Sequence, residues 1–387
     1  MRARSVAGRL ALGLVAAVLT LGLMELGVRL LLPQDLDYFN SAKIRRPSAR
    51  PGITWELIPG ARSASYIGVP VAINSLGLRD RELTVPKPPG TVRILAVGDS
   101  VTFGYGVALE DTFPKLLEAR LNAGASGPTR YEVVNAGVEA TGLDQYYHFV
   151  ESSAAALEPD ALLVNLALND IAPYRDPSAP PPPRVDGGRT LLRRVNGALL
   201  LNSHLYLLSY MSLKSFLYRT GVLDINRVHD YDFLALERPS ERQARAWRAT
   251  LGWLDRLVGL ARQRGWPAAV VVFPMEVQLT PGSLALYRRE FGTELGPAVL
   301  AGEPQRRLAD WGAARDVPVI DLLPAFRAAA DRPLYLRNRA ITFDPVHPSP
   351  LGHAVAAAAL HEALGTTLPL DGRRAARPAP VAPGPRG

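Results

Sequence analysis

The sequence predicts an α/β protein built on a parallel sheet of five strands, and two observations support that prediction. From Thr91 onward, short apolar runs alternate with longer amphipathic stretches. Strands that alternate with helices form a parallel sheet covered by helices on both faces. The composition agrees, because the chain of 387 residues is 48% hydrophobic and 21% charged and can bury a sizeable core.

Five runs have the length and apolar composition of buried strands. They span 93–97, 131–135, 161–166, 268–273 and 317–322. Amphipathic helices are expected between them, at 112–122, 242–264 and 304–315. The second helix has leucine at 251, 254 and 257, a spacing that puts all three on one face. We therefore expect the main domain to span 92–365.

The first 33 residues predict a single transmembrane helix. Three arginines precede an uncharged apolar run from 10 to 24, and apolar residues continue around Glu25 and Arg29 until Pro33. A stretch of this length spans a bilayer. No small-residue cleavage pattern follows the run, which favours an uncleaved signal anchor over a cleaved signal peptide. The arginines predict a single pass through the cytoplasmic membrane, with the rest of the chain on the extracytoplasmic side.

Three further segments differ from the alternating pattern. Segment 34–91 is irregular and proline-rich with short β-like runs, which indicates a stalk or a β-rich lead-in packed on the main domain. A helical insertion is expected over 176–240, where a proline-rich stretch precedes the apolar run 191–218. This insertion caps the active site, rests on the membrane, or adds a core helix, and the sequence leaves these alternatives open. The tail 366–387 is too poor in apolar residues to pack and is expected to be disordered.

Charge and cysteine content exclude several classes of function. The net charge is +8, but no basic stripe interleaved with aromatic residues is present, so the sequence does not predict nucleic-acid binding. The chain has no cysteine, which excludes a disulfide, a cysteine nucleophile and a cysteine-ligated metal. The motifs predict neither a metal nor a cofactor.

A serine, a histidine and a carboxylate stand where a sheet of this kind binds its ligands. Ser100 follows the first strand and opens a helix-like stretch, at the carboxyl edge of the predicted sheet. His347 lies three residues after Asp344 on a loop near the C-terminus. A serine hydroxyl is activated by a histidine base that a carboxylate orients. Asp321, which ends a strand, is the alternative carboxylate, and Asp344 is favoured.

Two groups follow the next two strands and could stabilise negative charge. Gly137 ends the second strand, where a glycine N–H can approach an oxyanion closely. Asn169 follows the third strand, where its side-chain amide can donate. Taken singly, each is more typical of an ordinary strand end or turn than of a catalytic donor.

The four motifs together resemble the blocks of the SGNH (GDSL-type) hydrolases. Gly-Asp-Ser, a glycine, Asn-Asp and Asp-x-x-His occur in the family's order over roughly 92–364. The resemblance implies a flavodoxin-like three-layer α/β/α sandwich. It implies Ser100 as nucleophile, His347 as base and Asp344 as its orienting group. It also implies an oxyanion hole made by the Ser100 N–H, the Gly137 N–H and the Asn169 amide.

Two positions depart from the family pattern. Ala167 stands where the third block usually has glycine, and Ala140 stands where the second block often has another glycine. Neither change removes a catalytic group, so the substrate's shape is affected more than the activity. The lead-in and the membrane anchor are similar to those of bacterial envelope-facing members.

The sequence thus predicts a serine esterase that cleaves or transfers a small acyl group on an envelope or exported substrate. Its expected partners are an acylated small molecule, lipid or carbohydrate, and the membrane through the N-terminal helix. Two alternatives remain. One is a polysaccharide O-acyltransferase, and the other is a non-catalytic scaffold that holds polysaccharide in the same cleft.

Overall fold

The computed structural model describes residues 2–38, 40–125, 127–171, 191–220, 234, 240–291, 295–337 and 344–368. The proline-rich part of the expected insertion, 176–188, and the tail from 369 lie outside the described residues. For these two segments the sequence expectations stay predictions.

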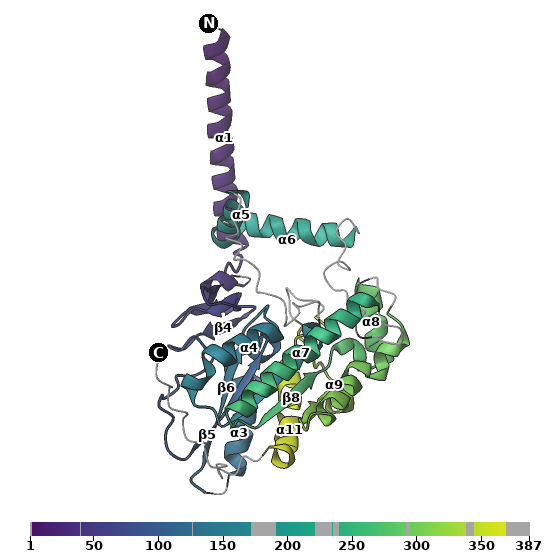
Figure 1. Ribbon diagram of the computed structural model, residues 1–387. Coiled ribbons are helices and arrows are strands. Elements are labelled where there is room, and N and C mark those ends of the chain that lie inside the picture. The colour runs from purple at the N-terminus through teal and green to yellow at the C-terminus, as the bar shows by residue number, and fades with distance from the viewer. Residues whose placement is uncertain are drawn as a thin grey trace, which may run out of the picture.

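A five-stranded parallel sheet forms the centre of the molecule (Figure 1). Its strands are β5 (Thr91–Gly98), β6 (Arg130–Gly137), β7 (Ala161–Ala167), β8 (Ala268–Phe273) and β9 (Val319–Asp321). The spatial order is β6-β5-β7-β8-β9, which is the flavodoxin-like order. Every residue of β5 and β7 is buried, as expected for central strands covered on both faces. The predicted fold class is confirmed.

Helices cover both faces of this sheet. They are α2 (Ser100–Phe103), α3 (Phe113–Gly124), α4 (Leu143–Ser152), α7 (Glu241–Gln263), α8 (Pro281–Phe291), α9 (Glu303–Ala313), α10 (Leu323–Ala328) and α11 (Pro350–Thr367). Short 3-10 turns lie at Ser41–Lys43, Leu109–Asp111, Ala154–Leu157, Leu168–Asp170, Glu276–Gln278 and Pro297–Ala301. α4 packs against α7, and α3 packs against α11 (Figure 1). The crossover from β5 to β6 through α3 and the crossover from β6 to β7 through α4 run in opposite directions along the sheet. Because both are right-handed, α3 and α4 lie on opposite faces.

Segment 34–91 packs on the sheet domain through two antiparallel hairpins. β1 (Arg45–Pro47) pairs with β2 (Trp55–Leu57), and β3 (Arg62–Tyr66) pairs with β4 (Val69–Ala72). Their side chains form a hydrophobic cluster separate from the main core. Its buried members are Ile44, Leu57, Tyr66, Ile67, Val71, Ile73, Phe103 and Leu336. Since Phe103 belongs to α2, the hairpins pack directly beside the helix that begins at Ser100.

Arg79 fixes the loop that follows α2. Its buried guanidinium donates to the carbonyls of Phe103, Gly104 and Val107 at 2.7, 2.6 and 2.6 Å. Burial lowers the pKa of Arg79 to about 10. The group therefore stays charged at neutral pH and satisfies three carbonyls that have no helical partner.

We expect Arg79→Ala to lower the free energy of unfolding by about 3–5 kcal/mol, because it opens a cavity and removes a charged donor from three buried carbonyls. Urea unfolding measures the change. Arg81→Ala is the matched control, because the Arg81 side chain is half exposed and its loss should cost about 1 kcal/mol or less. Equal losses for the two variants would contradict the assigned role of Arg79.

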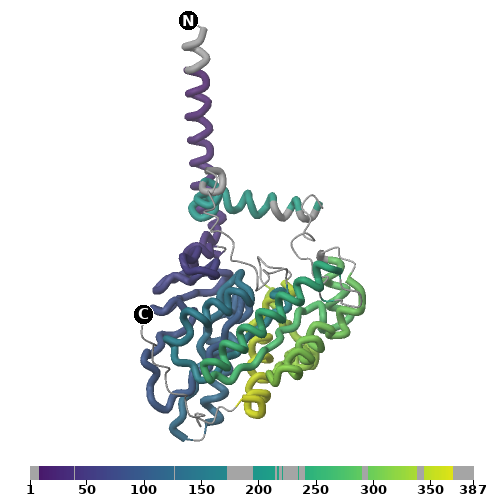
Figure 2. The backbone as a smooth tube through the Cα atoms, viewed as in Figure 1, coloured from purple at the N-terminus to yellow at the C-terminus, as the bar shows by residue number. Residues whose placement is uncertain are grey.

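Three helices lie apart from the sheet domain. α1 (Arg2–Leu31) projects from it, and α5 (Leu191–Asn202) and α6 (His204–Arg219) lie at the C-terminal end of α1 (Figures 1 and 2). Within α1, Gly8–Leu31 is long and apolar enough to cross a membrane, and its most apolar part is not buried at all. No described residue of α5 or α6 belongs to either hydrophobic cluster, so these two are not core helices.

Candidate active site

The candidate site begins at the junction of β5 and α2. The strand ends at Gly98, and Asp99 is the N-cap of α2, its carboxylate accepting the Val101 N–H at 2.8 Å. Ser100 is therefore the first residue of the helix, at the carboxyl edge of the sheet. Among the described hydrogen bonds none uses the Ser100 N–H, so this donor is open toward the edge.

The structure brings Ser100, His347 and Asp344 together across 247 residues of sequence. His347 Nε2 lies 2.8 Å from Ser100 Oγ, and His347 Nδ1 lies 2.6 Å from Asp344 Oδ2. The other Asp344 oxygen accepts the N–H groups of Val346 and His347 at 2.9 and 3.0 Å. A carboxylate held in this way puts the proton on Nδ1 and leaves Nε2 to accept the serine proton.

Charge around His347 favours its protonated form. Burial lowers the pKa of the imidazole, but the carboxylates of Asp344, Asp99 and Glu139 outweigh burial and raise the pKa above its usual 6.5. Burial acts to raise the pKa of Asp344, but His347 and two backbone N–H groups outweigh it and lower the pKa below its usual 3.8. The pair is thus arranged to stabilise an imidazolium beside a carboxylate.

Glu139 and two tyrosines form a wall of the site that the motifs do not contain. Tyr105 stacks on the His347 ring with the centroids 4.4 Å apart, and Tyr66 meets Tyr105 edge-on. The Tyr66 hydroxyl donates to Glu139 at 2.5 Å, and Arg45 donates to the Glu139 carbonyl. Since Tyr66 belongs to β3, the lead-in hairpins contribute to the surroundings of His347.

We expect Glu139→Gln to move the acid limb of kcat/KM to lower pH. The reaction needs neutral His347, and a raised pKa means that activity is lost at a higher pH as the solution is acidified. Removing the Glu139 charge lowers that pKa, while Gln keeps an acceptor for Tyr66. The control is Glu56→Gln, whose carboxylate pairs with Arg46 and Arg50. An unchanged acid limb in Glu139→Gln would contradict this electrostatic link.

Asn169 lies beside the serine in the structure. Its side-chain amide donates to Asp99 Oδ2 at 3.2 Å, and the Ser100 hydroxyl lies 3.3 Å from the same oxygen. Asp99 therefore has two roles that the motif alone does not reveal, because it caps α2 and orients Asn169. Burial raises the pKa of Asp99, and burial together with the Asp99 charge raises the pKa of Asp170 well above its usual 3.8.

Gly137 lies at the end of β6, where α2 passes closely. Its N–H donates to Asn135 Oδ1 at 3.0 Å, inside the turn that ends β6. A Cβ on Gly137 would lie 2.2 Å from the backbone nitrogen of Phe103, so the glycine allows α2 to pack closely on β6. Three residues later, Ala140 has a φ of 55°, in the left-handed region that favours glycine, and its side chain is exposed.

Asp321, the alternative carboxylate, lies at the end of β9 and not beside Asp344. Its carboxylate accepts the Leu323 N–H at 2.9 Å at the start of α10, and burial raises its pKa. The described contacts of Asp321 do not include His347, whereas those of Asp344 do. Of these two carboxylates, the one in contact with the His347 ring is that of Asp344.

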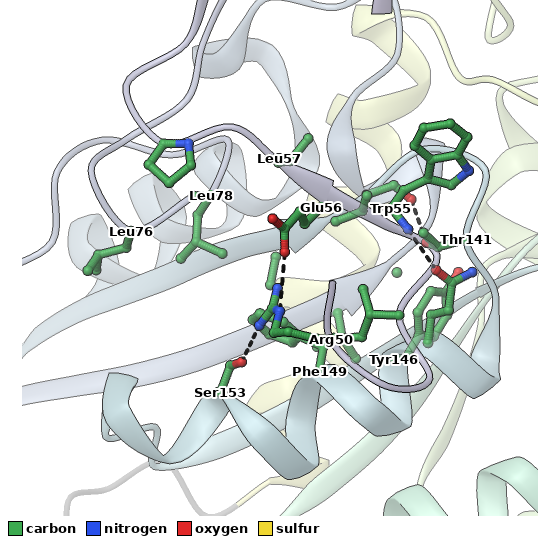
Figure 3. A pocket seen from close by; sticks show the side chains of 18 of the residues that line it. Arg50, Trp55, Glu56, Leu57, Leu76, Leu78, Thr141, Tyr146, Phe149 and Ser153 are labelled. Atoms are coloured by element: carbon green, nitrogen blue, oxygen red, sulfur yellow. Dashed lines mark hydrogen bonds and ion pairs between the residues drawn. The ribbon is translucent and has the colours of Figure 1, made fainter. Parts of the chain in front are cut away.

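A cavity of about 310 Å³ opens near the carboxyl ends of β5 and β6 (Figure 3). It lies between the lead-in and α4, and its lining includes Trp55, Thr141 and Phe149. Arg50 crosses it to reach Glu56 and Ser153 (Figure 3). Its lining contains neither Ser100 nor His347, so the cavity is separate from the reacting groups.

Comparison with known proteins places the chain in a family. Residues 96–355 match the GDSL-like Lipase/Acylhydrolase family, which is more than half of the chain. A comparison with curated protein sequences finds no match.

The solved structures that match the chain have low sequence identity and low TM-scores. Axe2, an acetylxylan esterase from Geobacillus stearothermophilus, is 15% identical with a TM-score of 0.41, over 71% of this chain and 94% of that one. TesA is 13% identical with a TM-score of 0.37, over 72% and 99%. A G-D-S-L family protein from Desulfitobacterium hafniense DCB-2 is 11% identical with a TM-score of 0.36, over 70% and 98%.

The chain belongs to the GDSL-like lipase/acylhydrolase family, and it is an enzyme that hydrolyses ester bonds. The family match confirms the resemblance drawn from the four motifs.

Proposed function

We propose that the protein is a serine esterase in which Ser100 is the nucleophile, His347 the general base and Asp344 its orienting carboxylate. The contact that carries this proposal is the 2.8 Å approach of His347 Nε2 to Ser100 Oγ. That distance lies within hydrogen-bond reach for proton transfer.

The reaction follows from these contacts in two halves. His347 Nε2 takes the Ser100 proton as Oγ attacks the ester carbonyl, and the imidazolium then protonates the leaving alkoxide. An acyl-serine remains. Water, deprotonated by the same nitrogen, attacks the acyl carbon and releases the acid, and the proton returns to Ser100. If a sugar hydroxyl attacks in place of water, the acyl group is transferred to the sugar. This reaction needs no other change in the site.

The proposed oxyanion donors are the Ser100 N–H, the Asn169 amide and one N–H from the turn after β6. We favour Ala140 over Gly137 for that third donor. The Gly137 N–H is bonded to Asn135, whereas no described hydrogen bond uses the Ala140 N–H. Ala140 also occupies the position at which the family's second block often has glycine, and its φ of 55° agrees with that preference.

Replacing a backbone amide by an ester tests this assignment, because it removes one N–H and leaves the side chain unchanged. We expect lactic acid in place of Ala140 to lower kcat by roughly 10²–10³-fold with little change in KM. Glycolic acid in place of Gly137 is the matched control. It should reduce stability by about 1 kcal/mol and leave kcat nearly unchanged. A large loss of kcat in the Gly137 ester, with little change in the Ala140 ester, would identify the Gly137 N–H as the third donor.

We also propose that α1 is an uncleaved anchor in the cytoplasmic membrane, with the catalytic domain on the extracytoplasmic side. Contacts at the end of the helix support this proposal, since Arg29 and Gln34 are hydrogen-bonded to residues of α5 and α6. Cleavage between residues 24 and 29 would cut the helix that presents Arg29 to α5. The substrate is then an acylated envelope or exported molecule that reaches the outer face of that membrane.

The linker after α1 supports a substrate close to the membrane. Tyr38 packs against the hydrophobic cluster that contains Phe103, and its carbonyl accepts the Ile67 N–H. Only the segment 32–37 separates that contact from the end of α1, and six extended residues reach at most about 20 Å. The tether therefore favours esters that lie at the membrane surface.

Trapping the acyl-enzyme tests the proposed function. The purified chain is mixed with an aryl acetate, quenched with acid during the burst and analysed by mass spectrometry. We expect one acetyl group on Ser100. A scaffold without catalytic activity would give no burst and no adduct, and an adduct on another residue would contradict the assignment. Adding oligosaccharide acceptors then shows whether the acyl group passes to water or to sugar.

A further inference from the structure

Helices α5 and α6 carry apolar side chains that no part of the described protein covers. The exposed fractions are 47% for Val195, 58% for Leu213 and 61% for Phe216. No described residue of the two helices is buried, although the stretch is mostly apolar. A soluble domain rarely leaves such a surface exposed to water.

The charges of this stretch are all of one sign. The sequence 191–220 contains Arg193, Arg194, Lys214 and Arg219 and has no aspartate or glutamate. It also contains four aromatic residues between 206 and 218. Basic and aromatic residues among apolar ones are typical of helices that lie in the headgroup region of a bilayer.

Glu25 of α1 ties α6 to the proposed anchor. Its carboxylate accepts the Ser203 hydroxyl at 2.7 Å and the N–H groups of His204 and Leu205 at 3.0 and 2.9 Å. These N–H groups belong to the first turn of α6 and have no partner within that helix. Glu25 thus adds to the cap of α6, beside the Ser203 hydroxyl that accepts the Tyr206 N–H at 3.0 Å, and places a negative charge at the positive end of the helix dipole.

Arg29 completes the link on the other side of the same turn. It pairs with Glu25 at 2.5 Å and donates to the carbonyl of Asn202, the last residue of α5, at 2.8 Å. The Gln34 N–H donates to the His204 ring at 2.8 Å. Among the described hydrogen bonds, those that join the stretch 191–220 to the rest of the chain all end on α1 or Gln34. The two helices are therefore held at the level of Glu25 and Arg29.

That level coincides with the outer boundary of a bilayer. From Gly8, where the apolar segment begins, Glu25 lies about 26 Å along the helix at 1.5 Å per residue. The hydrocarbon core is about 30 Å thick. α6 runs away from the end of α1 and not alongside it (Figures 1 and 2). A helix in this position extends along the membrane surface and does not cross the bilayer.

We propose that α5 and α6 lie in the outer headgroup region of the membrane that α1 crosses. Leu213 and Phe216 enter the upper acyl chains, and the positive charge of the stretch favours anionic lipid. The occupant of the exposed face is lipid, because that face continues the uncovered apolar surface of α1 itself. This inference rests on the proposed anchoring of α1 and does not depend on the proposed chemistry of Ser100.

The absence of cysteine makes a depth measurement direct. Leu213→Cys and Phe216→Cys are made singly in the full chain and labelled with a polarity-sensitive fluorophore. The proteins are reconstituted into vesicles of phosphatidylcholine and phosphatidylglycerol that carry a nitroxide close to the headgroup. Ala119→Cys is the matched control, since Ala119 is exposed on α3 of the sheet domain. We expect blue-shifted emission and nitroxide quenching for both α6 labels and neither effect for the control.

Three results would overturn the proposal, each in a distinguishable way. If the α6 labels behave like the Ala119→Cys label while the chain resists carbonate extraction, the helices stand in water. If the labels are blue-shifted but not quenched, protein covers the face, either a second copy or another partner. If carbonate releases the chain, the anchoring itself fails, and acyl-enzyme formation on Ser100, measured separately, is unaffected.

Discussion

Ser100→Ala should lower kcat on a short-chain aryl ester by roughly 10⁴–10⁶-fold. The hydroxyl is the only group of Ser100 that contacts His347, and without it no acyl-enzyme forms. The fold should survive, because Ser100 begins a helix that Asp99 caps through its own side chain. The loss of one hydrogen bond changes the free energy of unfolding by about 1 kcal/mol.

Two measurements check this expectation together. Steady-state hydrolysis gives kcat, and urea unfolding shows that the variant is folded. Ser153→Ala is the control, because its hydroxyl contacts Arg50 beside the separate cavity and it should keep full activity. Hydrolysis by Ser100→Ala at the wild-type rate would refute the proposed nucleophile.

Much of the fold could be predicted from the sequence, since all five strands of the sheet coincide with runs that have a clear apolar pattern. The prediction for 317–322 is too long by three residues, because β9 spans only Val319–Asp321. Pro318 has no N–H to donate to a neighbouring strand, and Leu322 is already the N-cap of α10. Apolar residues at the ends of a run do not show where pairing stops.

The site was less completely predictable, for a physical reason. Ser100, Asn169 and His347 stand at strand ends or in a short motif, so their positions follow from the pattern. Glu139 and Tyr105 have no such signal, because their effect on His347 depends on how the lead-in hairpins fold over the sheet edge. Only tertiary contacts reveal them.

Gly137 is another residue whose contacts could not be predicted from the sequence. A glycine at a strand end indicates either a donor for an oxyanion or a place where another backbone passes closely. The structure shows the close passage of α2 and a Gly137 N–H bonded to Asn135. The one sequence signal for Ala140 was the family pattern, and its left-handed φ is visible only in the folded chain.

Asp344→Asn should reduce kcat by roughly 10⁴-fold at neutral pH, by changing the tautomer of His347. One oxygen of Asp344 accepts the N–H groups of Val346 and His347, so the Asn carbonyl takes that place. The Asn NH₂ group then faces His347 Nδ1, which must become an acceptor. The ring proton moves to Nε2, and Nε2 can no longer take the proton of Ser100.

Asp321→Asn is the matched control for that substitution. Asp321 accepts a single N–H, from Leu323, and an Asn side chain can accept it equally well. Its activity should stay within about twofold of wild type, because it has no effect on the His347 tautomer. The two variants are compared by kcat across the pH range, with thermal unfolding to show that both are folded. A severe loss in Asp321→Asn with a mild one in Asp344→Asn would reassign the carboxylate, and the 2.6 Å contact of Asp344 with His347 would then be structural.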